Sequence, residues 1–212
     1  MSLPFFSMSE TFESIVGEST LSGFPALFVR FAGCNLRCAW CDTAYAYEPV
    51  YFSSYRELYE KVTASRQEFV LFTGGEPLLQ LGLPDLINEI VSGCGKKVIL
   101  ETNGSTGIEH VNSKAHISMD CKTPSSREHQ KCLFRNFEIL KRTDDVKFVV
   151  EDRNDYEYSR RIIDAYDLEK RVNVVFQTVH GKLDAARLAE WIVKDARPVR
   201  LNIQLHKYIG VK

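Results

Sequence analysis

Residues 25–43 read PALFVRFAGCNLRCAWCDT, an apolar segment followed at once by three cysteines. The apolar half, 25–31, is short and rich in aromatic and branched residues, which is typical of a buried strand. The other half spaces its cysteines as C-x3-C-x2-C. Chemically reactive residues directly after a buried strand are typical of parallel α/β proteins, whose sites lie at the carboxyl ends of the strands.

Short apolar segments recur along the rest of the chain. The candidate strands are 25–31, 69–73, 97–101, 116–120, 146–150, 172–177 and 199–204. Periodic apolar residues predict helices between them, at 54–65, 83–92, 132–143, 154–167 and 183–196. This alternation predicts an α/β fold with mostly parallel strands and helical crossovers, either open or curled into a barrel.

Length and charge limit the kind of protein. A chain of 212 residues fits one domain, and we expect an N-terminal extension over about 1–22, a core over about 23–204 and a tail at 205–212. Lys and Arg number 27 against 28 Asp and Glu, so the net charge of -1 argues against a nucleic-acid partner. The chain has no run of roughly 18 apolar residues and no secretory signal, so we expect a cytoplasmic protein with no membrane partner.

The six cysteines divide into a cluster and three scattered residues. Clustered thiols in a reducing compartment indicate metal ligands before disulfides. Three thiolates leave a zinc site incomplete unless a distant ligand joins, and they leave one iron of a four-iron cubane free. A zinc-binding interaction module therefore stays open as an alternative. Cys94, Cys121 and Cys132 are expected to be buried apolar residues.

The cysteine spacing, with Trp40 directly before Cys41, resembles the signature of radical S-adenosylmethionine (SAM) enzymes. The segment Thr73–Pro77, TGGEP, resembles the loop with which that superfamily binds the SAM amino group. The resemblance implies a partial (β/α)6 barrel and a [4Fe–4S] cluster held by Cys34, Cys38 and Cys41. It also implies that SAM binds the free iron.

Five sequence motifs, in order, resemble the 7-carboxy-7-deazaguanine synthase (QueE) family from about Glu10 to the C-terminus. They are FESIVGE (12–18), TGGEPLLQ (73–80), ETNGS (101–105), DCKTPSS (120–126) and QLHKY (204–208). That family is a carbon–nitrogen lyase of queuosine and 7-deazapurine biosynthesis. The implied reaction converts 6-carboxy-5,6,7,8-tetrahydropterin to 7-carboxy-7-deazaguanine with loss of ammonia. A 5′-deoxyadenosyl radical abstracts hydrogen, the ring contracts, and SAM is regenerated.

The resemblance implies a role for each matching residue. Thr43 matches a Mg2+ ligand. The implied substrate-binding residues are Ile15, Val16, Gly17, Glu18, Arg30, Thr73 and Lys212. The implied SAM-binding residues are Gly75, Glu76, Asn103, Asp120, Cys121, Lys122, Gln177, Thr178, Val179 and His180. The chemistry is suitable, because the planar guanidinium of arginine binds carboxylates bidentately and a carboxylate such as Glu18 accepts from an N–H/NH2 pair.

Two positions depart from the family pattern: Val16 stands where many relatives have Gln, and Ser19 replaces a common Gly. His206 lies in the segment expected to form the last strand, so we expect it to be structural. The resemblance also implies a homodimer and an external one-electron reductant of flavodoxin or ferredoxin type. A glycyl-radical activating enzyme, which acts on a protein partner, is the alternative enzyme.

Overall fold

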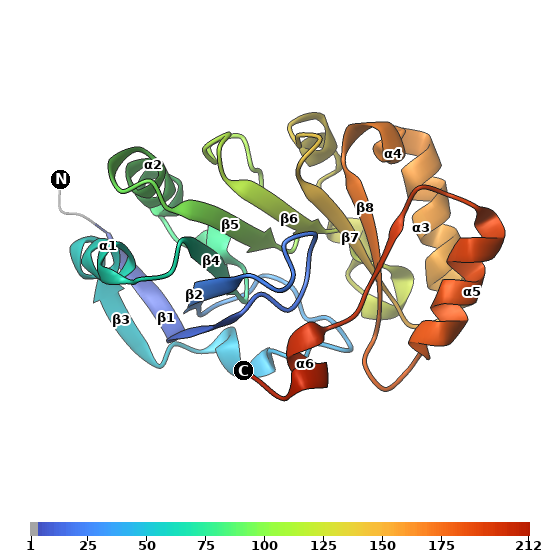
Figure 1. The fold of residues 1–212 in the computed structure, drawn as a ribbon, viewed down its shortest axis with the longest axis horizontal. Helices are drawn as coiled ribbons and strands as arrows, with labels where there is room; N and C mark the ends of the chain where they lie inside the picture. Colours follow the sequence, from blue (N-terminus) through green and yellow to red (C-terminus); the bar gives the residue numbers. More distant parts are fainter. Residues whose placement is uncertain (1–3) are drawn as a thin grey trace.

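The computed structural model describes residues 4–212, which form one nine-stranded sheet with the order β3-β1-β2-β4-β5-β6-β7-β8-β9 (Figure 1). Its strands are β1 (Phe5–Ile15), β2 (Pro25–Phe31), β3 (Tyr51–Ser54), β4 (Phe69–Gly74), β5 (Lys97–Thr102), β6 (His116–Asp120), β7 (Asp145–Val150), β8 (Asn173–Thr178) and β9 (Arg200–Asn202). The helices are α1 (Tyr55–Ala64), α2 (Leu83–Gly93), α3 (Arg153–Tyr166), α4 (Leu168–Arg171), α5 (Ala185–Asp195) and α6 (Leu205–Ile209).

All seven predicted strands are present, and from β2 to β9 they are parallel. The mostly parallel sheet is therefore confirmed. Sequence reasoning missed β1 and β3, which pair antiparallel at one end of the sheet. No helix within residues 4–212 has both the length and the apolar character to cross a bilayer.

The helix predicted over 132–143 is wrong. The segment holds only the short 3-10 turn Phe134–Glu138. Here the backbone N–H of Leu133 donates to the Gly104 carbonyl at 2.9 Å, and the Asn136 amide donates to the Thr106 carbonyl at 2.9 Å. Hydrogen bonds to the loop that holds Gly104 and Thr106 thus take the place of the hydrogen bonds of a helix. Asn side chains favour such alternatives, because they compete with the backbone for its hydrogen-bond partners.

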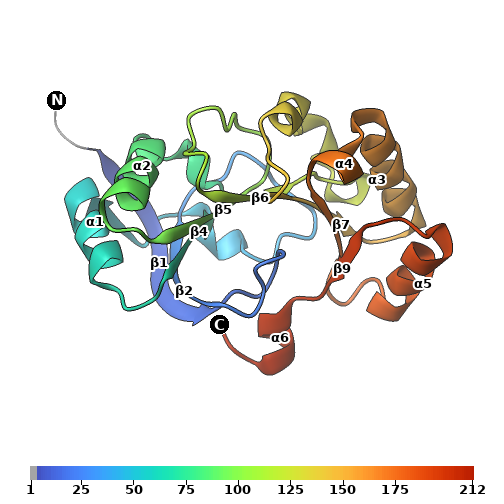
Figure 2. The same cartoon turned by 45° about the horizontal axis from the view of Figure 1, so that its top comes forward.

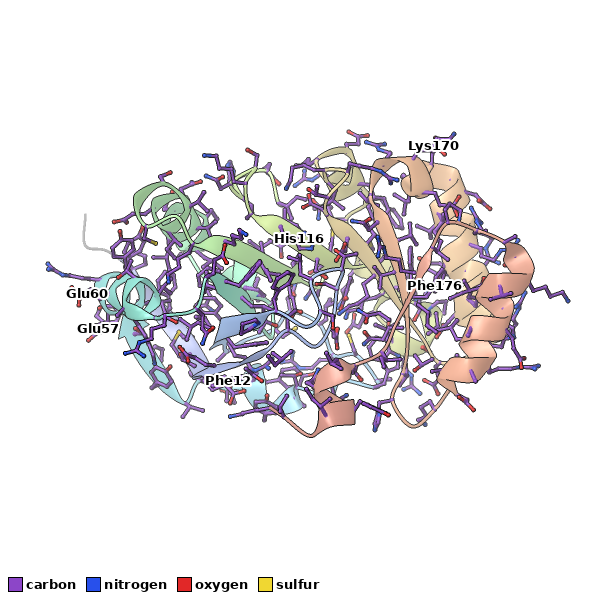
Figure 3. The ribbon with its side chains drawn as sticks, in the orientation of Figure 1. Phe12, Glu57, Glu60, His116, Lys170 and Phe176 are labelled. Carbon is purple, nitrogen blue, oxygen red and sulfur yellow. The ribbon has the colours of Figure 1, made fainter. Side chains whose placement is uncertain are left out.

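Helices cover one face of the curved sheet, where two apolar cores lie (Figures 1 and 2). Leu58 of α1 and Ile90 of α2 pack on Phe72 and its neighbours in the first core. In the second core Phe176 of β8 packs on Tyr156 of α3, with their ring centroids 5.0 Å apart. Glu57 and Glu60 lie on the outer side of α1, as Figure 3 shows. Burial of one apolar stripe of each helix fixes this layer on the sheet.

The other face of the sheet is partly apolar and partly polar. A small cluster of Val16, Phe28, Leu71, Ile99 and their neighbours fills one end. Toward the carboxyl ends of the strands the same face carries polar residues. The register pairs Arg30 with Thr73 and Asp120 with Lys147. Residues paired in register project to the same face of a sheet, so these side chains share one space.

The connection between β1 and β2 crosses this polar face. Thr20 donates its N–H and its hydroxyl to the two oxygens of Asp145, both at 2.8 Å. Ser19 has a φ of 69°, a left-handed conformation that favours glycine. The connection therefore lies across the strands and brings Gly17 and Glu18 to the carboxyl ends.

Candidate active site

A cavity of about 510 Å³ opens at the carboxyl ends of the parallel strands. Most of the predicted site residues line it. They are Cys34, Cys38, Cys41, Thr43, Ile15, Gly17, Glu18, Arg30, Thr73, Lys212, Gly75, Asn103, Asp120, Lys122, Gln177, Thr178, Val179 and His180. The parallel sheet explains this convergence, because every strand delivers the loop that follows it to the same edge.

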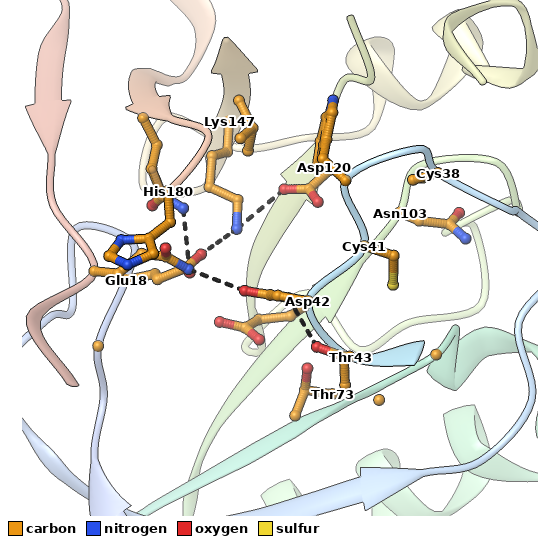
Figure 4. A pocket seen from close by; sticks show the side chains of 18 of the residues that line it. Glu18, Cys38, Cys41, Asp42, Thr43, Thr73, Asn103, Asp120, Lys147 and His180 are labelled. Atoms are coloured by element: carbon orange, nitrogen blue, oxygen red, sulfur yellow. Dashed lines mark hydrogen bonds and ion pairs between the residues drawn. The ribbon is translucent and has the colours of Figure 1, made fainter. Parts of the chain in front are cut away.

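The three clustered cysteines line this cavity, all half-buried and all free. Figure 4 shows Cys38 and Cys41 together on one side of it. The sulfur of Cys34 accepts from the Leu36 N–H at 3.4 Å and lies 3.7 Å from Nδ2 of Asn103. Burial raises the pKa of the Cys38 thiol to about 11. A bound metal would be needed to keep this thiol deprotonated at neutral pH.

Gly75 lies close to the cysteine loop. A Cβ atom added to Gly75 would lie 2.1 Å from the Gly33 carbonyl oxygen and 2.9 Å from Cβ of Cys34. Only glycine allows this approach of the two backbones. The space beside the cysteines is therefore bounded by exposed backbone, which suits a ligand that needs main-chain partners.

The donor set fits a cubane cluster better than a single metal ion. Among residues 4–212, no three His, Cys, Asp or Glu side chains converge on one point as zinc requires. A cubane distributes its thiolates over different irons, so its ligands need only surround a common space. Cys34, Cys38 and Cys41 all line the same cavity, which meets this looser requirement.

Three predicted site residues do not line the cavity. Val16 is fully buried, and its backbone N–H and carbonyl bond to Phe24 and Gly23. Cys121 lies in the second apolar core, with its sulfur 3.6 Å from that of Cys132.

Glu76 is the third, and it is also fully buried. Its carboxylate accepts from the N–H of Asn103 at 2.6 Å, the hydroxyl of Thr102 at 2.8 Å and the N–H of Leu78 at 3.0 Å. Burial raises the pKa of Glu76 to about 7, although these hydrogen bonds oppose the shift. In this structure the carboxylate thus supports the loop that carries Asn103.

A group of charged side chains also lines the cavity. The Lys147 amine pairs with Glu18 and lies 3.1 Å from Oδ1 of Asp120, as the dashed lines in Figure 4 show. Oδ2 of Asp120 pairs with Lys122 at 2.5 Å. Burial acts to raise the pKa of Glu18 and of Asp120, but the lysines outweigh it and hold both pKa values below their usual range.

The Arg30 side chain extends from β2 and lines the cavity. In this structure Nε of Arg30 pairs with Oε1 of Glu10 at 2.9 Å, and its guanidinium lies 5.9 Å from the ring centroid of Tyr45. These partners fix the direction of the guanidinium toward the cavity.

The segment after β9 closes one side of the cavity. Gln204 donates to Oε1 of Glu18 at 2.7 Å, and the Lys207 amine pairs with Asp42 at 2.7 Å. A Cβ on Gly17 would lie 1.9 Å from Nδ1 of His206, so the helix packs directly on the β1–β2 connection. The prediction that His206 lies in a strand is wrong, because it belongs to α6 and lines the cavity.

Sequence reasoning missed several cavity residues, above all Lys147, Glu101, Gln204 and Lys207. One signal was available for Lys147, since a charge inside the apolar segment VKFVV (146–150) marks a side chain with a buried partner. Gln204 is the N-cap of a short helix, and Lys207 lies within that helix. The helix follows a strand of only three residues, and elements this short give no periodic signal.

Comparison with known proteins agrees with this geometry. Residues 28–143 match the family model described as the Radical SAM superfamily. A 7-carboxy-7-deazaguanine synthase of Chlorobaculum tepidum is 37% identical over 96% of this chain and 93% of its own. The corresponding protein of Thermoplasma acidophilum is 36% identical over 95% of this chain and 96% of its own. The crystal structure of QueE from Escherichia coli superposes with a TM-score of 0.79 at 23% identity, covering 95% of both chains, and supports the fold.

The parallel sheet, the cysteine loop and the family match define a radical SAM protein. Within that superfamily, the full-length similarity to its relatives shows that the chain belongs to the 7-carboxy-7-deazaguanine synthase family.

Proposed function

We propose that this chain converts 6-carboxy-5,6,7,8-tetrahydropterin to 7-carboxy-7-deazaguanine with loss of ammonia. The observation that carries the proposal is that Cys34, Cys38 and Cys41 share one cavity with Arg30 and Glu18. Family membership supports the same reaction. One sheet runs through the described chain, which supports a single-domain organisation.

The cysteine side of the cavity suits the cofactors. The cluster and SAM, when bound, supply the radical that removes a hydrogen atom from the substrate. Cys34, Cys38 and Cys41 would hold the cluster through their thiolates. The backbone at Gly75 and the side chains of Asn103, Asp120 and Lys122 would hold SAM, together with Gln177–His180.

The opposite side suits the substrate. The Arg30 guanidinium would bind the pterin carboxylate, exchanging its pair with Glu10 for a bidentate one. The Glu18 carboxylate would accept from the N–H and NH2 groups of the pyrimidine ring. Ile15, Gly17, Thr73 and Lys212 line the same cavity and would complete the pocket.

A Mg2+ ion is part of the proposal. The Thr43 hydroxyl lines the cavity and donates to Oδ1 of Asp42 at 2.9 Å. Oxygen donors of this kind suit Mg2+ when a substrate carboxylate and water complete the octahedron. The homodimer, the flavodoxin-like or ferredoxin-like reductant and the cytoplasmic location stay predictions.

The proposal is tested by anaerobic turnover of the reconstituted enzyme with the pterin, SAM, dithionite and Mg2+, followed by mass spectrometry. We expect 7-carboxy-7-deazaguanine to form without net consumption of SAM. Cys34→Ala, Cys38→Ala and Cys41→Ala are each expected to abolish turnover. Cys94→Ala is the matched control, because this cysteine lies at the end of α2, bonds to the Ile90 carbonyl and is not among the residues that line the cavity.

Two results would refute the proposal. SAM cleavage without any deazapurine would favour a glycyl-radical activating enzyme. Bound zinc without sulfide, measured after anaerobic reconstitution, would favour a zinc module.

A further inference from the structure

Lys147 lies on the cavity face of β7 with 7% of its surface exposed. Its amine lies between two carboxylates that belong to different parts of the chain (Figure 4). Glu18 comes from the β1–β2 connection and Asp120 from the end of β6. The lysine thus joins the predicted substrate side of the cavity to the predicted cofactor side.

The two carboxylates depend on this lysine to different degrees. Asp120 has a second cation, the Lys122 amine at 2.5 Å. Within residues 4–212, Lys147 is the sole cation in an ion pair with Glu18. Within the same described residues, the other oxygen of Glu18 accepts from two neutral amides, Gln204 at 2.7 Å and Gln177 at 3.2 Å. Removing the lysine would therefore leave Glu18 without a counter-charge.

The surroundings of Glu18 would then favour its neutral form. Burial is the largest influence on its pKa and acts to raise it, and Asp120 acts in the same direction. Glu101 and His206 also face this group. Only the charge of Lys147, aided by hydrogen bonds from Lys147 and Gln204, outweighs the burial.

We propose that Lys147 is a positioning residue for the reaction, which holds the Glu18 carboxylate ionised and aimed at the amide edge of the substrate ring. The inference rests on the proposed function. Both substrate and product carry an N–H next to an NH2 group, and these two donors require two acceptors. An ionised carboxylate provides them, whereas a protonated one presents an O–H donor toward a donor.

The substitution Lys147→Met keeps the length of the side chain and removes its charge. We expect it to raise the pKa of Glu18, so that this group is protonated at neutral pH. Product binding should weaken at least tenfold at pH 6.5. The loss should shrink as the pH rises toward 9, because Glu18 then ionises again. Wild-type binding has no such recovery, since its Glu18 is already charged.

The measurement is calorimetric titration of the anaerobic, SAM-loaded holoenzyme with 7-carboxy-7-deazaguanine between pH 6 and pH 9. The ratio of variant to wild-type dissociation constants cancels any titration of the ligand. Lys147→Arg, which retains a cation, should restore most of the affinity and give a flat ratio. Lys170→Met is the charge-matched control, because Lys170 is exposed on α4, is not among the residues that line the cavity, and pairs with Asp167.

A Lys147→Met ratio near one at every pH, or a tenfold loss that stays constant from pH 6 to pH 9, overturns the inference. Failure of the wild type itself to bind product refutes the proposed function instead. If Lys147→Met does not fold, Glu18→Gln is compared with Glu18→Gln/Lys147→Met. Dissociation constants within twofold of each other support action through Glu18, and a larger further loss means that Lys147 acts on the ligand by another route.

Discussion

Glu76 follows Gly75 directly in the chain, yet only Gly75 lines the cavity, and Glu76 is buried in the protein. Gly75 faces the cavity, whereas the Glu76 carboxylate points into the protein and binds three donors from two segments. A buried carboxylate with neutral donors is costly to ionise. Its pKa of about 7 lies above the ordinary 4.5, so folding and protonation of this group are linked.

We expect Glu76→Gln to reduce the free energy of unfolding by about 1–3 kcal/mol, because the amide NH2 cannot accept a hydrogen bond from the donors that face it, whereas a carboxyl oxygen can in either protonation state. Between pH 4.5 and about 7 the folded wild type binds more protons than the unfolded chain, so its stability falls as the pH rises. The variant lacks this contribution, and the difference between the two proteins should be largest at pH 5 and smaller at pH 8. Guanidinium unfolding at both pH values measures it, and a difference that grows with pH would contradict the raised pKa.

Among single residues, the location of those in recognisable sequence motifs could be predicted from the sequence. The cysteines, Arg30 and Glu18 all line the cavity as expected. Val16 and Cys121 lie beside cavity residues in the chain but point elsewhere, because neighbouring residues of a strand or turn face opposite sides. The motifs therefore predicted where the site lies, but not which way each side chain points.

At the level of elements, the β1–β2 connection determines the shape of the cavity. It is anchored through Thr20 to Asp145, which is fully buried and also lies 3.2 Å from Nε2 of His116. Two residues earlier, Glu18 meets Lys147. Loss of the Thr20–Asp145 hydrogen bonds should therefore make the segment that carries Glu18 more mobile.

Thr20→Val removes the hydroxyl donor at nearly constant volume. We expect a loss of about 1–3 kcal/mol in the free energy of unfolding, because Asp145 keeps its burial and loses a partner. Amide hydrogen exchange over residues 17–23 should become faster, and KM should rise more than kcat falls. Thr63→Val on the exposed side of α1 is the control and should stay within 0.5 kcal/mol. Unchanged exchange in Thr20→Val would show that the anchor is not needed.

Periodicity predicted most elements because each helix buries one apolar stripe and each strand is a short apolar run. It failed at 132–143, where contacts with the loop after β5 replace helical bonds. It also failed for β1, whose residues alternate too weakly to mark a strand and which is stabilised by its two neighbours.

On the scale of the whole molecule, the apolar cores and the cysteine loop are separate. Both large cores lie between the sheet and its covering helices, whereas the three cysteines lie on the cavity side. The sheet should therefore form without the cluster, and the cluster should add stability by binding the folded state alone.

Removing the cluster with a chelator should leave the far-ultraviolet circular dichroism spectrum unchanged. We expect a loss of at least about 1 kcal/mol of stability, which corresponds to roughly 2–4 °C in Tm for a chain of this size. Differential scanning calorimetry under anaerobic conditions measures the shift. Collapse of the spectrum on chelation would show that the cluster is part of the folding core.

The order of residues along the chain was sufficient for the parallel α/β fold, the cysteine cluster and the family, because periodicity and spacing are local properties. The pairing of Lys147 with Glu18, the burial of Glu76 and the closure by α6 depended on the folded chain. Each of these features depends on contacts between segments that are far apart in sequence. Folding determines which segments are buried together, and therefore which charged groups become neighbours. Local patterns contain no information on such distant neighbours, so these contacts emerge only when the sheet curves and the β1–β2 connection crosses it.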